Sequence, residues 1–262
     1  MKRTDPQSRY GRIADLVDLD VLAVRRVTLI GCGSMGQPIS DQLARHGVGT
    51  RPPGRLRLID GDTVAARNGV GTHFPESDQG RLKVEVTSEM IHAANGEVNV
   101  SYWNQMLTPA DIPAVADLAG QSDLLGLFAD SFELMLQISD RCADICPQIM
   151  AVFGPNADYA EVAFSVPGAT PPLSTTMGRR KRESISQPQA LGCDTAYVAN
   201  FAAAVCLRLL LGSAKGSELL PCYTNAPLFV LGLRKSWLFE QEPDDIARTI
   251  VRVRVDPQLE GE

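Results

Sequence analysis

VTLIGCGSMG at residues 27–36 and LIDGDTVAARN at residues 58–68 are the two stretches that decide the fold. The first is an apolar run that ends in a glycine-rich turn, which is the pattern of a strand followed by a helix. Glycines let such a turn bring its backbone close to a ligand, and the helix N-terminus offers free N–H groups to phosphate oxygens. The turn glycines are Gly31, Gly33 and Gly36.

The second stretch is an apolar run that ends in two carboxylates, Asp60 and Asp62. An acidic residue after the second strand of such a unit is placed to bind ribose hydroxyls. A dinucleotide dehydrogenase usually carries it about 20 residues after the turn, whereas Asp60 follows Gly31 by 29 residues. Together the two stretches predict a nucleotide site, with a tight turn that binds no ligand as the alternative.

The composition is that of an ordinary soluble protein. The 262 residues are 44% hydrophobic and 21% charged, which suits one large α/β domain or two small ones. The formal net charge of -6 argues against nucleic acid as a partner. No apolar run approaches the ~20 residues that span a bilayer, and no signal-type segment is seen at the N-terminus, so no membrane association is predicted. Six scattered cysteines then indicate reduced thiols and a cytoplasmic location.

Strand-like and helix-like segments alternate through the first half of the chain. Strands are expected at 27–30, 55–60, 98–103, 123–130 and 148–153, and helices at 35–46, 82–94, 109–119 and 132–146. This succession predicts an α/β fold in three layers, a Rossmann-like, mainly parallel sheet with helices on both faces and right-handed crossovers.

The second half differs in character. Strands are expected at 159–166, 228–233, 236–239 and 250–255, a mobile polar loop at about 167–192, and an apolar helix at 196–211 that is too short and alanine-rich to favour a membrane span. We expect these strands to extend the sheet in antiparallel fashion. The chain is therefore predicted to be a single domain over 1–262, with a nucleotide-binding half at 1–154 and a sheet extension at 155–262.

Further motifs flank the two glycine-containing stretches. The residues after the second apolar run form D-x-D-x-V-x-x-x-N, which ends at Asn68, and Gly-x-x-Lys follows at 80–83. An Arg-Tyr-x-Arg segment precedes the first strand at 9–12, and Asp130 closes the strand expected at 123–130. In this order the motifs resemble those of the ThiF-type adenylyltransferases, relatives of ubiquitin-activating enzymes and of the molybdopterin-synthase activating enzyme. The resemblance runs from about residue 9 to about residue 154.

The resemblance implies an enzyme that uses ATP and Mg²⁺ to activate the C-terminal carboxylate of a ubiquitin-like or sulfur-carrier protein. The carboxylate would attack the α-phosphate as pyrophosphate leaves, and cations would offset the gathered negative charge. The implied site residues are Gly31, Gly33 and Gly36 at the phosphates, Asp60 and Asp62 at the ribose side, Arg67, Asn68 and Lys83 at the phosphates, Asp130 at magnesium, and Arg12, which reaches into a partner subunit. The role of Arg12 implies a homodimer. Taken singly, Lys83, Asp130 and Arg12 are equally compatible with structural or solvated roles.

Four positions depart from the family pattern. The family carries a second arginine three residues after the asparagine, an aspartate three positions before the magnesium aspartate, an asparagine just after it and an arginine one turn later. Those positions hold Gly71, Leu127, Ser131 and Met135, with Arg67 as a possible replacement for the first arginine. A catalytically degenerate scaffold subunit that binds such a partner is therefore one alternative. An NAD-dependent oxidoreductase is another, although no acid–base pair supports it.

The cysteines predict no zinc site. Many relatives hold zinc with two C-x-x-C pairs, and this chain has none. Cys142 and Cys146 are one helical turn apart without a second pair, which favours core thiols. Cys193 precedes the apolar helix, where the N-terminal dipole favours a thiolate. It is either the acceptor of the activated carboxylate, as a thioester, or a structural thiol. The basic run at 179–182 is expected to be a solvated loop face.

Overall fold

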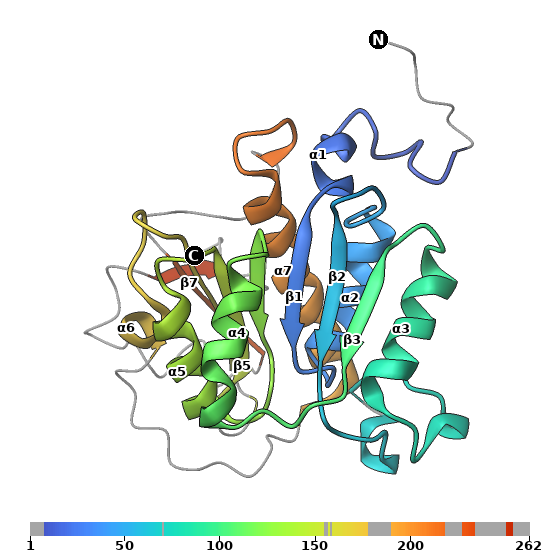
Figure 1. The fold of residues 1–262 in the computed structure, drawn as a ribbon, viewed down its shortest axis with the longest axis vertical. Coiled ribbons are helices and arrows are strands. Elements are labelled where there is room, and N and C mark those ends of the chain that lie inside the picture. The colour runs from blue at the N-terminus through green and yellow to red at the C-terminus, as the bar shows by residue number, and fades with distance from the viewer. Residues whose placement is uncertain are drawn as a thin grey trace, which may run out of the picture.

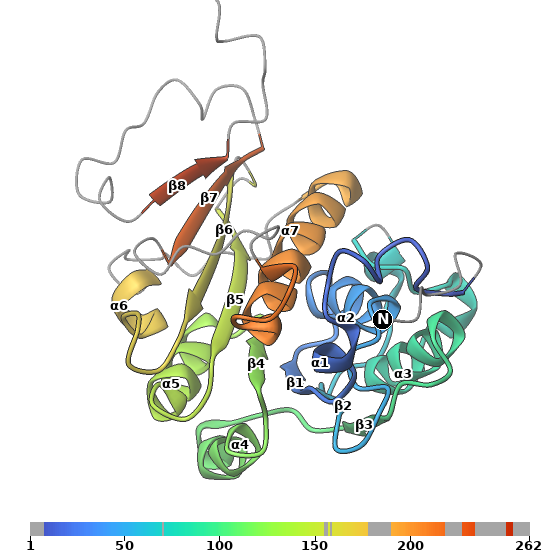
Figure 2. The same cartoon turned by 90° about the horizontal axis from the view of Figure 1, so that it is seen from above.

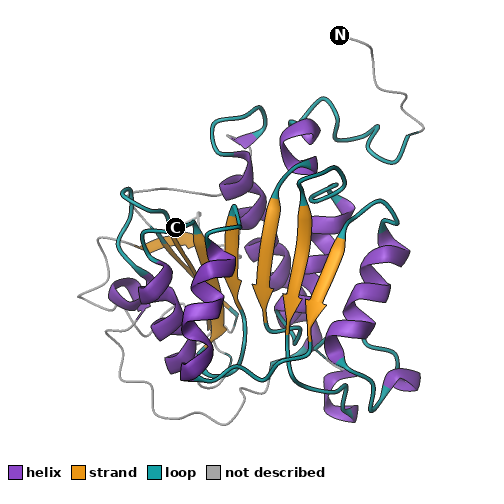
Figure 3. Ribbon diagram, viewed as in Figure 1, coloured by secondary structure: helices purple, strands orange, loops and turns teal. Residues whose placement is uncertain are grey.

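The computed structural model describes residues 8–69, 71–154, 157, 159–177, 190–217, 227–233 and 250–253. These residues form one eight-stranded sheet in the order β3-β2-β1-β4-β5-β6-β7-β8 (Figures 1 and 3). The strands are β1 (Arg26–Ile30), β2 (Arg55–Ile59), β3 (Val100–Trp103), β4 (Leu124–Leu127), β5 (Gln148–Phe153), β6 (Tyr159–Ser165), β7 (Leu228–Gly232) and β8 (Ile250–Val253). The α-helices are α1 (Leu19–Ala23), α2 (Gly36–Arg45), α3 (Lys83–Ala94), α4 (Ile112–Ala119), α5 (Phe132–Cys142), α6 (Leu173–Met177) and α7 (Gly192–Leu211). Short 3₁₀ turns are η1 (Ala66–Gly69), η2 (Glu76–Asp78) and η3 (Pro109–Asp111).

The five strands from β1 to β5 run parallel, as the alternating pattern predicts. β1 pairs with β2 and β4, β2 also pairs with β3, and β4 pairs with β5, all in parallel register. A parallel strand needs a crossover connection, and the connecting segments supply the helices that cover the sheet. The predicted α/β class with a mainly parallel sheet is confirmed.

Helices lie on both faces of the sheet (Figure 2), and two clusters of buried apolar residues lie between the sheet and these helices. Val27 and Leu29 of β1 share a buried cluster with residues of α2, α3 and α7. Ile30, on the other side of the same strand, joins the cluster that contains the buried faces of α4 and α5. This division follows from the two-residue repeat of a strand, which sends neighbouring side chains to opposite faces.

The C-terminal strands extend the sheet in both antiparallel and parallel directions. β6 pairs antiparallel with β5 and β7, as expected, but β8 runs parallel to β7. The polar stretch predicted as a loop contains the short helix α6, whose Leu173 and Met177 are buried. The strand expected at 236–239 and residues 178–189 of the expected loop, which include the basic run at 179–182, lie outside the described residues. The assignment of the whole chain to a single domain stays a prediction.

Helix α7 is longer than its apolar pattern predicts. It begins at Gly192 rather than at Ala196 and has 20 residues, because Asp194 accepts a hydrogen bond from the backbone N–H of Leu191 at 3.3 Å and caps the first turn. Among the described helices it is the one long and apolar enough to cross a bilayer by length and composition. The sequence argument that this helix is too short to span a membrane is therefore wrong. Instead, its buried side chains pack in the same cluster as those of α2 and the sheet.

Candidate functional site

The glycine turn lies at the carboxyl edge of the sheet, between β1 and α2. Gly31 has a φ of +94°, and a Cβ there would lie 2.6 Å from the backbone nitrogen of Ala129. A Cβ on Gly36 would lie 1.8 Å from the carbonyl oxygen of Gly31. A Cβ on Gly33 would meet nothing within 4 Å. Gly31 and Gly36 are therefore required by packing, whereas Gly33 leaves open space beside the N-terminus of α2, where an anion is favoured.

The Asp60 carboxylate joins the glycine turn to the end of β2. Its Oδ2 accepts a hydrogen bond from the backbone N–H of Cys32 at 2.6 Å, and its Oδ1 accepts one from the N–H of Asp62 at 2.8 Å. Burial raises the pKa of the Asp60 carboxyl, while these two hydrogen bonds act against that rise. A carboxylate offers about four acceptor positions, so both oxygens of Asp60 can still accept a ligand hydroxyl.

The structure brings Lys83 to the same edge. Residues 80–83 run beside 62–64, with Thr63 and Leu82 as bridge partners, and the N–H of Lys83 donates to the carbonyl of Asp62 at 3.0 Å. The Lys83 Nζ then donates to Asp62 Oδ2 at 2.7 Å, with a side chain only 8% exposed. Lys83, for which a solvated position is the alternative when it is taken alone, is thus a buried ammonium that pairs with a single carboxylate in the described part of the chain.

Asn68 and Arg67, on the segment after the D-x-D pair, make no hydrogen bond or ion pair with the glycine turn or with Lys83 in the described part of the chain. Asn68 Oδ1 accepts from the backbone N–H of Ala65 at 2.8 Å, which stabilises the η1 turn. Arg67 is exposed on the same turn. Two residues of the loop nevertheless reach inward. The N–H of His73 donates to the buried Gln37 of α2 at 3.1 Å, and a Cβ on Gly71 would lie 3.4 Å from that of Ser34 in the glycine turn.

Asp130 follows β4 at the carboxyl edge and is exposed. Its neighbour Ala129 packs against Gly31, so Asp130 lies on the same edge as the glycine turn. Within the described ranges no group of three or more His, Cys, Asp or Glu residues could hold a metal ion. Mg²⁺ in nucleotide sites needs only one or two carboxylates, because waters and substrate phosphates complete its shell. The donor set therefore fits magnesium brought in with a nucleotide, and it does not form a cage of protein ligands.

The N-terminus of α7 approaches the glycine turn as well. A Cβ on Gly71 would lie 3.7 Å from Thr195 Oγ1, and Thr195 stands in the first turn of α7 two residues after Cys193. Among the described cysteines, Cys193 is the exposed one. Cys32, inside the glycine turn, is fully buried, and burial raises the pKa of its thiol far above the usual range. Cys193, and not Cys32, is therefore the thiol that a solvent-borne substrate can reach.

Arg12 lies apart from all these residues. The hydroxyl of Tyr10 accepts a hydrogen bond from Asn95 Nδ2 at 2.8 Å, just after α3, and packs against Gly47, just after α2. The arm that carries the exposed Arg12 therefore lies at the amino edge of the sheet. The ten residues of α2 separate that edge from the glycine turn by about 15 Å. The structure does not bring Arg12 to the site of its own chain.

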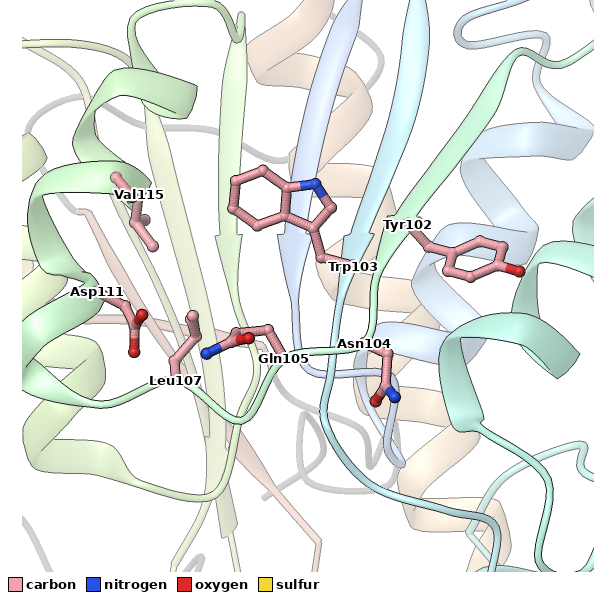
Figure 4. A pocket seen from close by; sticks show the side chains of 8 residues that line it. Tyr102, Trp103, Asn104, Gln105, Leu107, Asp111 and Val115 are labelled. Carbon is pink, nitrogen blue, oxygen red and sulfur yellow. The ribbon is translucent and has the colours of Figure 1, made fainter.

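A pocket that the motifs do not predict opens beside Asp60. Its volume is about 460 Å³, and it is lined by Tyr102, Trp103, Asn104, Gln105, Leu107, Asp111, Ala114 and Val115. Figure 4 shows Trp103, Gln105 and Leu107 facing Val115 of α4, while Tyr102 points the other way, toward α3. The N–H of Asp60 donates to the carbonyl of Trp103 at 3.2 Å, so the pocket borders the candidate site. The sequence could have indicated these pocket residues only by their position directly after a parallel strand, because loops at that end of a sheet line ligand sites.

This fold and this site define a class: a doubly wound α/β protein with a nucleotide-type glycine turn at the carboxyl edge of its sheet. Within that class the chain belongs to the ThiF family, whose model matches residues 7–232. The match extends well beyond residue 154, where the motif resemblance fades, and includes the antiparallel extension of the sheet.

Curated relatives cover different parts of the chain. The bovine (Bos taurus) adenylyltransferase and sulfurtransferase MOCS3 is 31% identical over 140 residues, which is 51% of this chain and 29% of the relative. The ubiquitin-like modifier-activating enzyme 5 of Bombyx mori is 26% identical over 214 residues, 72% of this chain and 53% of the relative. The Haemophilus influenzae tRNA threonylcarbamoyladenosine dehydratase is 32% identical over 108 residues, 39% of each. The chain thus spans about half or less of the length of these relatives.

Solved structures agree on the fold. The crystal structure of Escherichia coli MccB with ATP has a TM-score of 0.66 at 23% identity, over 80% of this chain and 66% of that one. The E. coli MccB structure with AMPCPP and MccA gives 0.65 over 83% of this chain and 68% of that one, also at 23% identity.

We expect alanine substitutions at Gly31, which has no room for a Cβ, and at Gly33, which has open space beside it, to have opposite effects on stability and on nucleotide binding. Gly31→Ala forces a Cβ into the backbone of residues 128–129 at a positive φ, so it should lower the free energy of unfolding by about 2–4 kcal/mol. Gly33→Ala, which meets no neighbour, should change it by less than ~0.5 kcal/mol yet weaken nucleotide binding. Urea unfolding and calorimetric titration with ATP measure the two effects. A Gly33→Ala protein that binds ATP normally contradicts this assignment.

Proposed function

We propose that this protein is an ATP-dependent adenylyltransferase that activates the C-terminal carboxylate of a ubiquitin-like or sulfur-carrier protein. The observation that carries the proposal is the buried Lys83 ammonium beside Asp62, within one hydrogen-bonded unit that also contains Asp60 and the glycine turn. A buried cation at a helix N-terminus and an open glycine suit a polyphosphate.

The similar proteins support the same chemistry. The bovine relative is named an adenylyltransferase, and the Bombyx relative a ubiquitin-like modifier-activating enzyme. E. coli MccB has been crystallised with ATP and with MccA. Because the chain spans only part of its curated relatives, the carboxylate substrate is assigned here by class and not by name.

Each side chain has a physical task in this proposal. When bound, ATP with Mg²⁺ supplies the phosphorus to which a carboxylate oxygen bonds as pyrophosphate leaves. Asp60 accepts the ribose hydroxyls on the lone pairs that the backbone leaves open. Lys83 donates toward the phosphates from its buried position, where a charge interacts more strongly than in water. Asp130 would hold the magnesium. Arg67 and Asn68 border the phosphates from the η1 turn.

The pocket beside Trp103 suits the base of the nucleotide. It is adjacent to Asp60, and its lining combines apolar walls from Leu107 and Val115 with the amide groups of Asn104 and Gln105. Nucleotide-sized pockets typically have this mixture of apolar walls and a few polar groups. Asp60 would then hold the ribose between the base and the phosphates.

A homodimer in the cytoplasm completes the proposal. Arg12 lies about one helix length, or ~15 Å, from the glycine turn of its own chain, so it would serve the site of a second subunit. The alternative is a scaffold subunit that binds the same partner without chemistry. Gly71 in place of the family arginine favours that alternative, and the Lys83–Asp62 pair favours an enzyme.

Exchange of labelled pyrophosphate into ATP, in the presence of candidate Gly-Gly-ending proteins, tests the activity. Lys83→Ala and Asp130→Ala should each lower the exchange rate by about 10²–10³-fold, because each removes charge from the reacting phosphate or its metal. Lys215→Ala, an exposed lysine at the far edge, is the matched control and should keep the wild-type rate. If the wild type binds its partner but never exchanges pyrophosphate, the scaffold alternative is correct.

Cys193 is proposed as the acceptor of the activated carboxylate. Its Sγ would attack the carbonyl carbon of the acyl-adenylate, AMP would leave with the bonding electrons, and the thiol proton would pass to solvent. Cys193→Ala should abolish a reductant-sensitive thioester with the partner while pyrophosphate exchange continues, since adenylation comes first. Because the thiol is exposed, the variant should melt like the wild type. A full yield of thioester from Cys193→Ala would place the nucleophile elsewhere.

Subunit mixing tests the role of Arg12. Arg12→Ala and Lys83→Ala should each be inactive as homodimers. In a mixed dimer, the Arg12→Ala chain keeps its own Lys83 and receives Arg12 from its partner, which restores one of the two sites. Random mixing should therefore recover about a quarter of the wild-type exchange rate. No recovery, with mixed dimers demonstrated by mass spectrometry, would mean that Arg12 does not act across subunits.

A further inference from the structure

The main chain at Gly61 is packed directly against the main chain of residues 105–106. A Cβ on Gly61 would lie 2.3 Å from the nitrogen of Met106, 2.6 Å from its Cα and 2.8 Å from the carbonyl carbon of Gln105. Because all three neighbours are main-chain atoms, no side-chain rotation could make room for a larger residue. The φ of Gly61 is not positive, so the close approach of two main chains alone requires glycine at this position.

The residues on either side of Gly61 are firmly held. The N–H of Asp62 donates to Asp60 Oδ1 at 2.8 Å, and the other oxygen of Asp60 accepts from the N–H of Cys32 at 2.6 Å. Asp62 also pairs with the Lys83 ammonium at 2.7 Å, and its carbonyl accepts from the N–H of Lys83 at 3.0 Å. Gly61 therefore lies in the middle of the hydrogen-bonded unit that is proposed to contact the ribose and the phosphates.

The other side of the contact is a wall of the pocket proposed for the base. Gln105 and Leu107 face this pocket (Figure 4), and Met106 between them is 60% exposed. Leu107 packs at the margin of the apolar cluster that contains α4. Residues 104–107 make no hydrogen bond within the described part of the chain. The middle of this segment is therefore held in place mainly by its packing on Gly61.

We propose that Gly61 is a positioning residue for the nucleotide, which sets the separation between the base pocket and the ribose carboxylate of Asp60. An alanine Cβ needs ~3.5 Å to its neighbours, so residues 105–106 and Gly61 would have to separate by roughly 1 Å more than they do. The segment at 104–107 would move, because it has no hydrogen bonds to resist the shift. A nucleoside could then no longer contact the pocket wall and Asp60 at the same time.

The inference rests on the nucleotide site proposed above but not on the transfer chemistry. A purely structural role for Gly61 makes a different prediction. If this glycine served only the folding of the loop, its replacement would weaken every contact with the nucleotide alike. A positioning role predicts instead that the base and ribose lose affinity while the phosphates keep theirs, since the Asp62–Lys83 pair lies on the side that stays in place.

Calorimetric titration with two fragments of ATP distinguishes these cases. Adenosine has the base and ribose alone, and inorganic tripolyphosphate with Mg²⁺ has the phosphates alone. Gly61→Ala should weaken adenosine binding about tenfold, the factor that corresponds to one net hydrogen bond, and leave tripolyphosphate binding unchanged. Gly33→Ala, at the open position of the glycine turn, should do the reverse. Gly96→Ala is the matched control, because its Cβ would meet only the carbonyl oxygen of His92 at 3.7 Å, and it should bind both fragments like the wild type.

Unchanged adenosine affinity in Gly61→Ala, an equal loss of tripolyphosphate affinity, or a wild type that does not bind adenosine would each overturn the inference. If Gly61→Ala misfolds by circular dichroism, Met106→Gly loosens the same segment without a clash. It should show the same loss for adenosine alone, and a variant that binds both fragments normally would overturn the inference. A wild type that binds both fragments but never exchanges pyrophosphate would refute the adenylyltransferase and leave the role of Gly61 standing. Pyrophosphate exchange by the wild type, together with normal adenosine binding by Gly61→Ala, would do the opposite.

Discussion

The Asp60 carboxylate is the contact on which the carboxyl edge of this sheet depends. One of its oxygens holds the N–H of Cys32 at 2.6 Å and the other the N–H of Asp62 at 2.8 Å. It thereby ties the glycine turn after β1 to the loop after β2, two segments 28 residues apart. Burial raises the pKa of this carboxyl, and the two bonds from backbone N–H groups act against that rise because they favour the ionised form. The positions of Asp62 and then of Lys83 follow from this contact.

Packing around the turn leaves little freedom in how the next elements start. Gly31 has no room for a Cβ against residues 128–129, and Gly36 has none against Gly31, so α2 must begin tight against the end of β4. The N-terminus of α7 reaches the same place. Gly71 lies between Thr195 and Ser34, and a Cβ at Gly71 would be in van der Waals contact with both side chains. Two helix N-termini therefore point toward one edge, and each brings partial positive charge to it.

Much of the fold could be predicted from periodicity, because most elements bury one regular face. The strand at 148–153 matches β5 to the residue, and α3 differs from its predicted bounds by one residue at its start. The short helices α1 and α6 could not be predicted, since five residues carry too little periodicity. The strand expected through Asp130 ends at Leu127, because the backbone of 128–129 turns to pack on Gly31.

The candidate site was less predictable, since its key contacts join segments distant in sequence. The family resemblance predicts Asp62 and Lys83 as site residues but does not predict their ion pair, and nothing in the sequence indicates the pocket beside Trp103. The roles inferred for Arg67, Asn68, Asp130 and Cys193 stay predictions, as does the location in the cytoplasm.

The distribution of charge at the carboxyl edge bears on the proposed chemistry. Asp60 and Asp62 lie beside Lys83, whose ammonium is paired with Asp62 at 2.7 Å. A polyphosphate beside Lys83 would therefore also lie close to two carboxylates. The position where the family has an arginine holds Gly71, and Arg67 is exposed on its turn. In the proposed chemistry, the charge of the transferring phosphate would be offset by Lys83, by magnesium and by Arg12 of a second subunit.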